Sequence, residues 1–114
     1  MAETFNTADI AVTSSEQTLY TAPNAASTDR AIVLSLRVTN IDGSSDDDVT
    51  VTIYESDGTT KKAAIASTIA VPADTSIELA GSSKIVLKNG EVVKITGVAA
   101  SGDLEAYLSA LEIT

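Results

Sequence analysis

Apolar and polar residues alternate at every second position along most of this chain, and this alternation constrains the fold more than any other feature. In residues 48–55 two valines and an isoleucine fall on one side of an extended backbone, and two threonines and Tyr54 fall on the other. Residues 31–40 repeat the pattern, which predicts a core-facing row made of Ile32, Leu34, Leu36 and Val38. Each segment therefore has the pattern of an antiparallel strand with one buried and one exposed face.

Turn-forming residues separate these alternating segments. The loop Asp42–Asp46 predicts a hairpin between the two strands just described, because Asp, Gly and Ser adopt turn conformations at low cost. A second turn, Asp57-Gly58, precedes a predicted strand over residues 61–71. Pro72 ends that strand, because proline has no backbone N–H to donate to a neighbouring strand.

The dipeptide Asn89-Gly90 gives the strongest turn signal in the chain. It lies between the β-type segments 84–88 and 92–96, and it follows a further predicted strand over residues 76–80. Asn and Gly both tolerate the positive φ angles of a type I′ turn, so these residues predict a tight hairpin between the flanking strands.

The last segment, residues 103–114, fits two patterns. Its leucines have helical spacing, whereas the residues from Tyr107 to Ile113 alternate as in a strand. We expect a strand, because a single short helix is less consistent with the rest of the chain than a strand that closes a sheet.

The complete pattern predicts an all-β protein. Two shorter strands are expected near Val12 and Tyr20, followed by a polar loop at residues 23–29. Roughly seven to nine strands predict an antiparallel β-sandwich, jelly-roll or immunoglobulin-like, that occupies residues 1–114 as a single domain. Residues 1–9 are weakly patterned and are expected to form an N-terminal arm.

The composition argues against several classes of function. Sixteen acidic and seven basic residues give a net charge of −9, which opposes binding to nucleic acid phosphates. No segment approaches the roughly 18 apolar residues of a membrane span, and the N-terminus lacks the pattern of a signal peptide. We therefore expect neither a nucleic acid nor a membrane as partner, and synthesis in the cytoplasm without a signal peptide.

The residues needed for most kinds of catalysis are missing. The chain has no histidine and no cysteine, which removes the commonest general base, the commonest metal ligands and the thiol nucleophile. Its six glycines are scattered singly and form no phosphate-binding loop. We therefore predict that the protein is not an enzyme and has no catalytic or cofactor-binding residues.

One acidic cluster is a candidate metal site. Asp42, Asp46, Asp47 and Asp48 offer oxygen ligands from a single loop, but glycine follows Asp42 directly and no glutamate closes the loop at the EF-hand distance. A solvated loop tip is therefore preferred to a calcium site, and no metal ligand is assigned.

Aromatic residues are too few to suggest a stacking platform for sugars or bases. The chain has no tryptophan, and its aromatic residues are Phe5, Tyr20, Tyr54 and Tyr107. Each is expected to pack in the core or in an interface. Tyr54, on the presumed outer face of its strand, is the candidate for a contact between subunits.

Several stretches of the chain resemble a family of small virion proteins of tailed bacteriophages, known as head decoration, cement or minor structural proteins. The matching stretches are residues 31–40, 48–51, 65–74, 84–87, 89–91, 102–107 and 109–113. The resemblance implies a β-sandwich that forms homo-oligomers on a particle surface. It implies no cofactor and no active site. Self-association as a trimer is favoured, because a domain this small has a limited core and its N-terminal arm is weakly patterned.

Three functions follow as hypotheses. The first is a capsid decoration or cement protein that stabilises the head by binding at junctions of major capsid subunits. The second is a tail or baseplate component, structural or host-binding, and the third is a small carbohydrate-binding module. The expected partners are the major capsid protein or other virion proteins, and the expected location is the virion, with the capsid surface favoured.

Overall fold

The computed structural model describes residues 2–98 and 103–114. Within these two ranges the chain forms nine strands and no helix. It follows that this part of the chain offers no helix of the length and hydrophobicity needed to cross a membrane.

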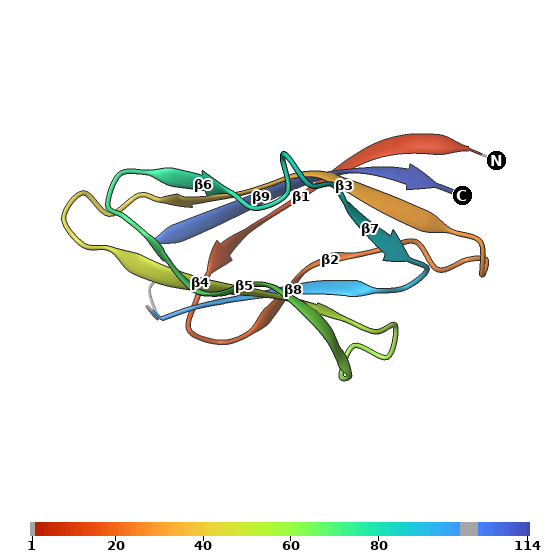
Figure 1. Cartoon of the computed structure of the whole chain (residues 1–114), viewed down its shortest axis with the longest axis horizontal. Coiled ribbons are helices and arrows are strands. Elements are labelled where there is room, and N and C mark those ends of the chain that lie inside the picture. Colours follow the sequence, from red (N-terminus) through yellow and green to blue (C-terminus); the bar gives the residue numbers. More distant parts are fainter. Residues whose placement is uncertain (1, 99–102) are drawn as a thin grey trace.

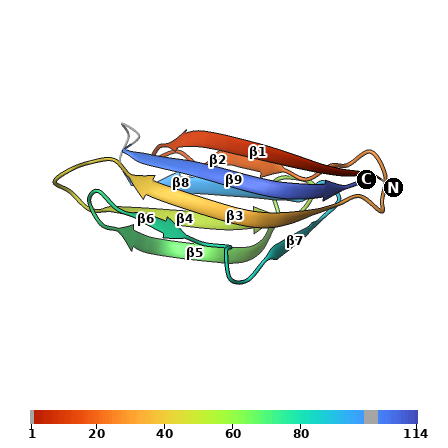
Figure 2. The same ribbon diagram turned by 90° about the horizontal axis from the view of Figure 1, so that it is seen from above.

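The nine strands form two antiparallel sheets that pack face to face (Figures 1 and 2). Sheet A has the order β1-β9-β3-β6, with β7 pairing to the other end of β3, and sheet B has the order β2-β8-β4-β5. The strand bounds are β1 (Glu3–Val12), β2 (Gln17–Thr21), β3 (Arg30–Asn40), β4 (Asp47–Tyr54), β5 (Lys61–Val71), β6 (Ser76–Glu78), β7 (Ile85–Lys88), β8 (Val92–Gly97) and β9 (Leu104–Ile113).

This strand order is that of a jelly roll. Each sheet has four positions, and the fourth position of sheet A is divided between β6 and β7, which pair with opposite ends of β3. Successive strands mostly alternate between the sheets, whereas β4 and β5 form a hairpin within sheet B. The predicted antiparallel β-sandwich is confirmed, and of its two named forms the topology is the jelly roll.

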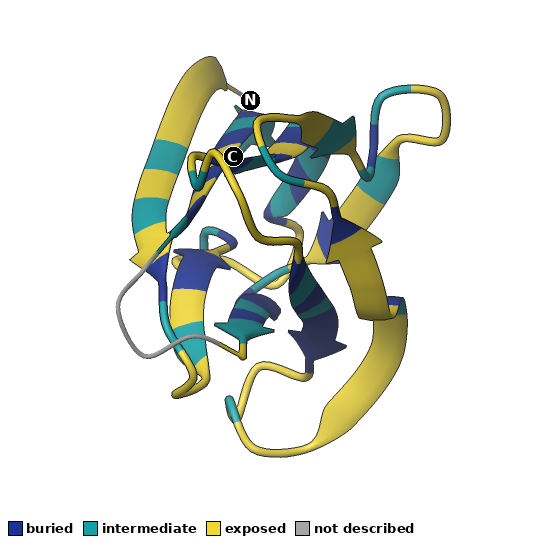
Figure 3. Ribbon diagram, turned by 90° about the vertical axis from the view of Figure 1, so that its left-hand side faces the viewer, coloured by how far each residue is buried: buried dark blue, intermediate teal, exposed yellow. Residues whose placement is uncertain are grey.

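The core lies between the inner faces of the two sheets, where the buried segments gather in Figure 3. The largest fully buried side chains are leucines of sheet A, such as Leu36 and Leu108, and Ile95 of sheet B. Burial of each contributes about 1.5–3 kcal/mol relative to exposure. Strand β9 lies between β1 and β3, so its buried residues join the two sides of sheet A. The expected strand over residues 103–114 is thus confirmed as β9.

The predicted Asn89-Gly90 hairpin is wrong. Strand β7 pairs with β3 in sheet A, whereas β8 pairs with β2 and β4 in sheet B, so the turn connects the two sheets. The N–H of Glu91 donates to the carbonyl of Lys88 at 3.1 Å, and Gly90 has a φ of 77° while Asn89 does not have a positive φ. A single positive φ at the third residue is typical of a type II turn and not of type I′.

The predicted hairpin at Asp42–Asp46 is wrong for the same reason. The strand before this loop, β3, belongs to sheet A, and the strand after it, β4, belongs to sheet B. Turn chemistry predicts that the chain reverses, but it does not determine whether the next strand pairs with the previous one or crosses to the opposite sheet.

A β-bulge corrects the predicted core face of β3. The register against β9 shifts between Val33 and Ser35, so Ala31 and Val33 are buried on one side of the bulge and Leu36 and Val38 on the other. One extra residue in a strand reverses the face of every side chain beyond it. Ile32 and Leu34, predicted to join the core row, are therefore only half-buried.

The expected N-terminal arm contributes to a sheet. Residues 3–9 form the outer part of β1, which pairs with β9 over ten residues without a register shift. The backbone N–H groups of Ala2 and Thr114 each donate to the carbonyl of the other, at 2.7 and 2.9 Å. The two ends of the chain therefore lie side by side, as Figure 1 shows, and residues 3–7 are exposed on both faces of the sheet.

Candidate functional site

The acidic loop has the contacts of a self-contained turn. The Asp42 carboxylate accepts hydrogen bonds from the N–H of Ser44 at 2.8 Å and from its hydroxyl at 3.0 Å, and these bonds lower the pKa of Asp42. Asp46 accepts from the N–H of Ala73 at 3.1 Å, and Asp47 from the N–H of Asp48. In residues 2–98 and 103–114 no three acidic side chains come together as metal ligands.

Tyr54 is not exposed, so it is not available for the subunit contact that its strand pattern suggested. Its side chain is only 5% exposed. Its hydroxyl donates to both carboxylate oxygens of Glu16, at 2.8 and 2.9 Å, and this contact raises the pKa of Tyr54. The Lys94 ammonium lies 4.5 Å from the centre of the ring. Neighbouring side chains thus cover the outer face of sheet B at this point.

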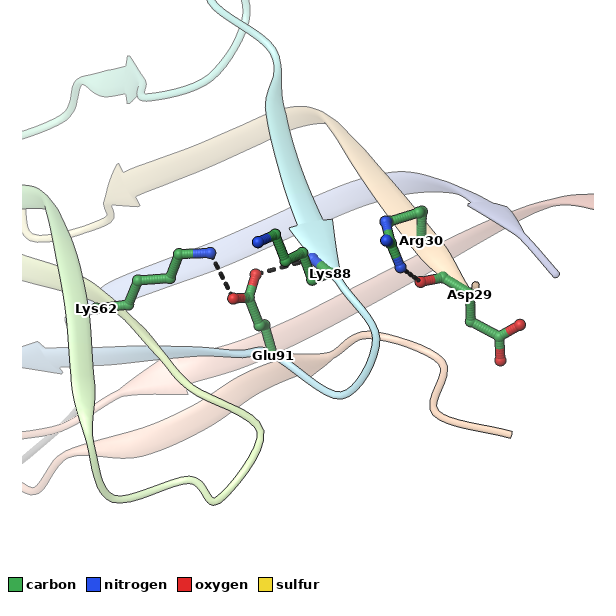
Figure 4. Close-up of polar contacts among 5 residues, drawn as sticks. All are labelled: Asp29, Arg30, Lys62, Lys88 and Glu91. Atoms are coloured by element: carbon green, nitrogen blue, oxygen red, sulfur yellow. Dashed lines mark hydrogen bonds and ion pairs between the residues drawn. The ribbon is translucent and has the colours of Figure 1, made fainter. Parts of the chain in front are cut away.

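Two buried polar contacts connect the sheets. Glu91, 3% exposed, accepts from the N–H of Lys88 at 2.8 Å and from the Lys62 ammonium at 2.5 Å (Figure 4). Burial acts to raise the pKa of Glu91, but the bonds from Lys62 and Lys88 outweigh it, so that the pKa is lowered. At the other contact, Tyr20 of β2 donates to Glu112 of β9, and burial raises the pKa of Tyr20. Because their partners all belong to the same chain, these groups hold the fold together.

The exposed residues that best fit an interaction surface lie on the outer face of sheet A. Strand pairing places Phe5 opposite Leu111, Leu111 opposite Ile32, and Ile32 opposite Val86. Directly opposed residues of antiparallel strands point to the same face, so these four side chains form one continuous row across β1, β9, β3 and β7. Phe5 is 76% exposed and Val86 60%, while the other two are half-buried. We refer to these four residues as the apolar row.

The charges on this face nearly balance. The outward positions of the sheet A strands carry four acidic side chains, Glu3, Asp9, Glu78 and Glu105, and three basic ones, Arg30, Arg37 and Lys88. Since the whole chain has a net charge of −9, nearly all of its excess negative charge lies elsewhere. The outer face of sheet A therefore combines a contiguous apolar row with little net charge, as interaction surfaces often do.

A shallow depression lies on the same face, two residue rows beyond the apolar row. It has a volume of about 390 Å³, and its lining includes Asp9, Arg37, Glu105 and Tyr107. Tyr107 is 52% exposed, which leaves its ring available to a ligand. Sequence reasoning assigned no binding residue here, because the lining comes from three strands whose pairing the sequence alone does not determine.

Comparisons with known proteins show a shared fold but no family. Neither the protein-family models nor the curated proteins include a match to this chain. A solved structure of Bacillus endospore appendages, described as disulfide-linked pili, matches with 18% identity and a TM-score of 0.58, and the match covers 99% of this chain and 87% of that one. This chain has no cysteine and therefore cannot form such disulfide links.

A chain of the infectious bursal disease virus T13 particle also matches, with 14% identity and a TM-score of 0.56. The match covers 97% of this chain but only 31% of the viral one, so this chain spans about a third of the viral protein's length. At these identities the likeness is one of fold. The class of protein that fold and surface define is thus a jelly-roll β-sandwich with one nearly neutral outer face.

Proposed function

We propose that this chain is a non-enzymatic structural protein of a tailed-phage virion, and that it is a capsid decoration protein that binds at junctions of major capsid subunits. The observation that carries the proposal is the outer face of sheet A, where the apolar row lies on a paired sheet with little net charge. A decoration protein needs an exposed contact surface, because it stabilises the particle only by binding the assembled form and not the free subunits.

The solved structures support a role in an assembly. One comes from pili and the other from an icosahedral virus particle, and both therefore build their fold into repeating structures. The residues of this chain support the same role, because the carboxylates of Glu91 and Glu112 are used in internal contacts and the sequence has no histidine or cysteine to act as general base, thiol nucleophile or metal ligand. The alternative is that the chain is a structural or host-binding component of the tail or baseplate.

The experiment is to add purified protein to phage particles that lack it and to quantify the bound copies by gel densitometry. A truncated chain without residues 1–7 is the test variant, since residues 2–7 carry Phe5 but no buried side chain. The proposal predicts that the truncated chain folds and binds heads with lower occupancy. Equal occupancy would show that the outer end of β1 is not part of the contact. Binding to tails alone would show that the protein is a tail component.

A carbohydrate-binding role is the second candidate, and the depression around Tyr107 is the observation that favours it. An exposed aromatic ring beside carboxylates and a guanidinium can stack on a sugar and hydrogen-bond its hydroxyls. A glycan array with wild-type protein and Tyr107→Ala tests this directly. Glycan binding that the substitution abolishes would support this second role, and an array without signal would reject it.

A further inference from the structure

We infer that the outer face of sheet A is the contact surface of a two-fold symmetric dimer of this chain. The inference goes beyond the proposed virion role, because it concerns the free protein, whose dimer would have to dissociate before the same face could contact a capsid. The rows of opposed residues across the sheet supply the contact. Beside the apolar row lies a charged row in which Glu3 opposes Ile113, Ile113 opposes Arg30, and Arg30 opposes Lys88.

The charged row is acidic at one end and basic at the other. Glu3 lies on β1 at one edge of sheet A, and Arg30 and Lys88 lie on β3 and β7 towards the other edge. A two-fold axis that runs parallel to the strands, between β9 and β3, lays β1 of one copy over β7 of the second. This symmetry places each Glu3 against Lys88 of the other copy.

The apolar row is self-complementary under the same axis. Phe5 of one copy then faces Val86 of the second, and Leu111 faces Ile32, so that the two most exposed side chains of the apolar row cover one another. Face-to-face sheets pack in this aligned manner with about 30° between their strands. That angle carries the next charged row, with Asp9 and Glu78, away from the crossing point.

The charge of the rest of the molecule favours a second copy at this face over a second copy elsewhere. Two copies that meet through other surfaces bring excess negative charge together, whereas the sheet A face has four acidic and three basic outward side chains. Three residue rows across four strands cover roughly 400 Å² of sheet. This is below the ~800 Å² per partner of a standard interface, so the dimer should dissociate on dilution. A two-fold contact gives a dimer in place of the trimer that the sequence favoured.

Sedimentation equilibrium of the full chain over a range of concentrations tests the inference. Phe5→Asp should raise the dimer dissociation constant about tenfold or more, because it places a charge in the apolar row, opposite Val86 of the other copy. Ile41→Asp is the matched control: it makes the same change in net charge at a 54% exposed site outside sheet A, and it should leave the dissociation constant unchanged. Circular dichroism verifies that each variant is folded, and Val86→Asp replaces Phe5→Asp if that variant misfolds.

Charge reversals separate this geometry from a simple effect of net charge. Glu3→Lys makes the chain less negative, so an effect of net charge alone would strengthen association. The proposed geometry predicts the opposite: this variant should weaken the dimer, because the new lysine would face Lys88 of the other copy. Lys88→Glu should weaken it as well, and the two changes together should restore it. A wild-type monomer at every concentration, a trimer, an equal effect of Ile41→Asp and Phe5→Asp, or tighter association of Glu3→Lys would each overturn the inference.

Discussion

Gly90 and Gly58 form a matched pair that tests the turn between the two sheets. Both have positive φ angles, 77° and 74°, so a side chain at either position is strained in its backbone. They differ in their surroundings. A Cβ at Gly90 would lie 2.9 Å from Cγ of Asn24 and 3.0 Å from Cβ of Ser56, whereas a Cβ at Gly58 would meet nothing within 4 Å.

The two alanine substitutions therefore separate strain from crowding. Gly58→Ala should cost about 1 kcal/mol of unfolding free energy, which is the penalty for an L residue in the left-handed region. Gly90→Ala should carry the same penalty and a further ~2 kcal/mol of overpacking. Asn24 does not move away freely, because its side-chain oxygen accepts a hydrogen bond from Asn89 at 3.0 Å.

Thermal and urea unfolding of the wild type and both variants measure the difference. At ~4 °C for each kcal/mol, the melting temperature of Gly90→Ala should lie about 8 °C below that of Gly58→Ala. The slopes of the urea transitions should agree, since neither change alters the surface exposed on unfolding. Equal midpoints for the two variants would refute the close packing of Gly90 against Asn24 and Ser56.

Three further predictions concern the core, the buried carboxylate and the acidic loop. Leu108→Ala should lower the free energy of unfolding in urea by about 3 kcal/mol, because Leu108 is fully buried. Leu111→Ala on the outer face should cost clearly less, and similar costs would show that the core does not lie on the Leu108 side of β9. Glu91 has a lowered pKa, so the stability it contributes is present above about pH 4.5 and is lost as the pH falls further; Glu91→Gln should flatten this part of the profile in acid titrations monitored by circular dichroism. Chelation of calcium should leave the melting temperature unchanged, and a drop of several degrees would reveal a metal site in the loop 42–48.

The strands themselves were predictable from the sequence. Alternation locates β4 and β5 within a residue of their observed bounds, and the choice of strand over helix for β9 is confirmed. Alternation shows which side chains share a face within one segment, and this pattern can be identified without knowing which other segment the strand pairs with.

Strand partners and the interaction surface were not predictable in the same way. The turn at Asn89-Gly90 has the same residues whether the chain forms a hairpin or crosses between sheets, and the distinction depends on β3, which lies far away in the sequence. The apolar row combines Phe5, Ile32, Val86 and Leu111 from four separate segments. Its members become recognisable only once the bulge in β3 and the pairing of β9 are known.

Cryo-electron microscopy of the native particle would show directly whether this chain decorates the capsid. If it is a decoration protein, jelly-roll density of this size repeats over the head at junctions of major capsid subunits. Density confined to the tail or baseplate, or a head with no copy of this fold on its surface, would contradict it.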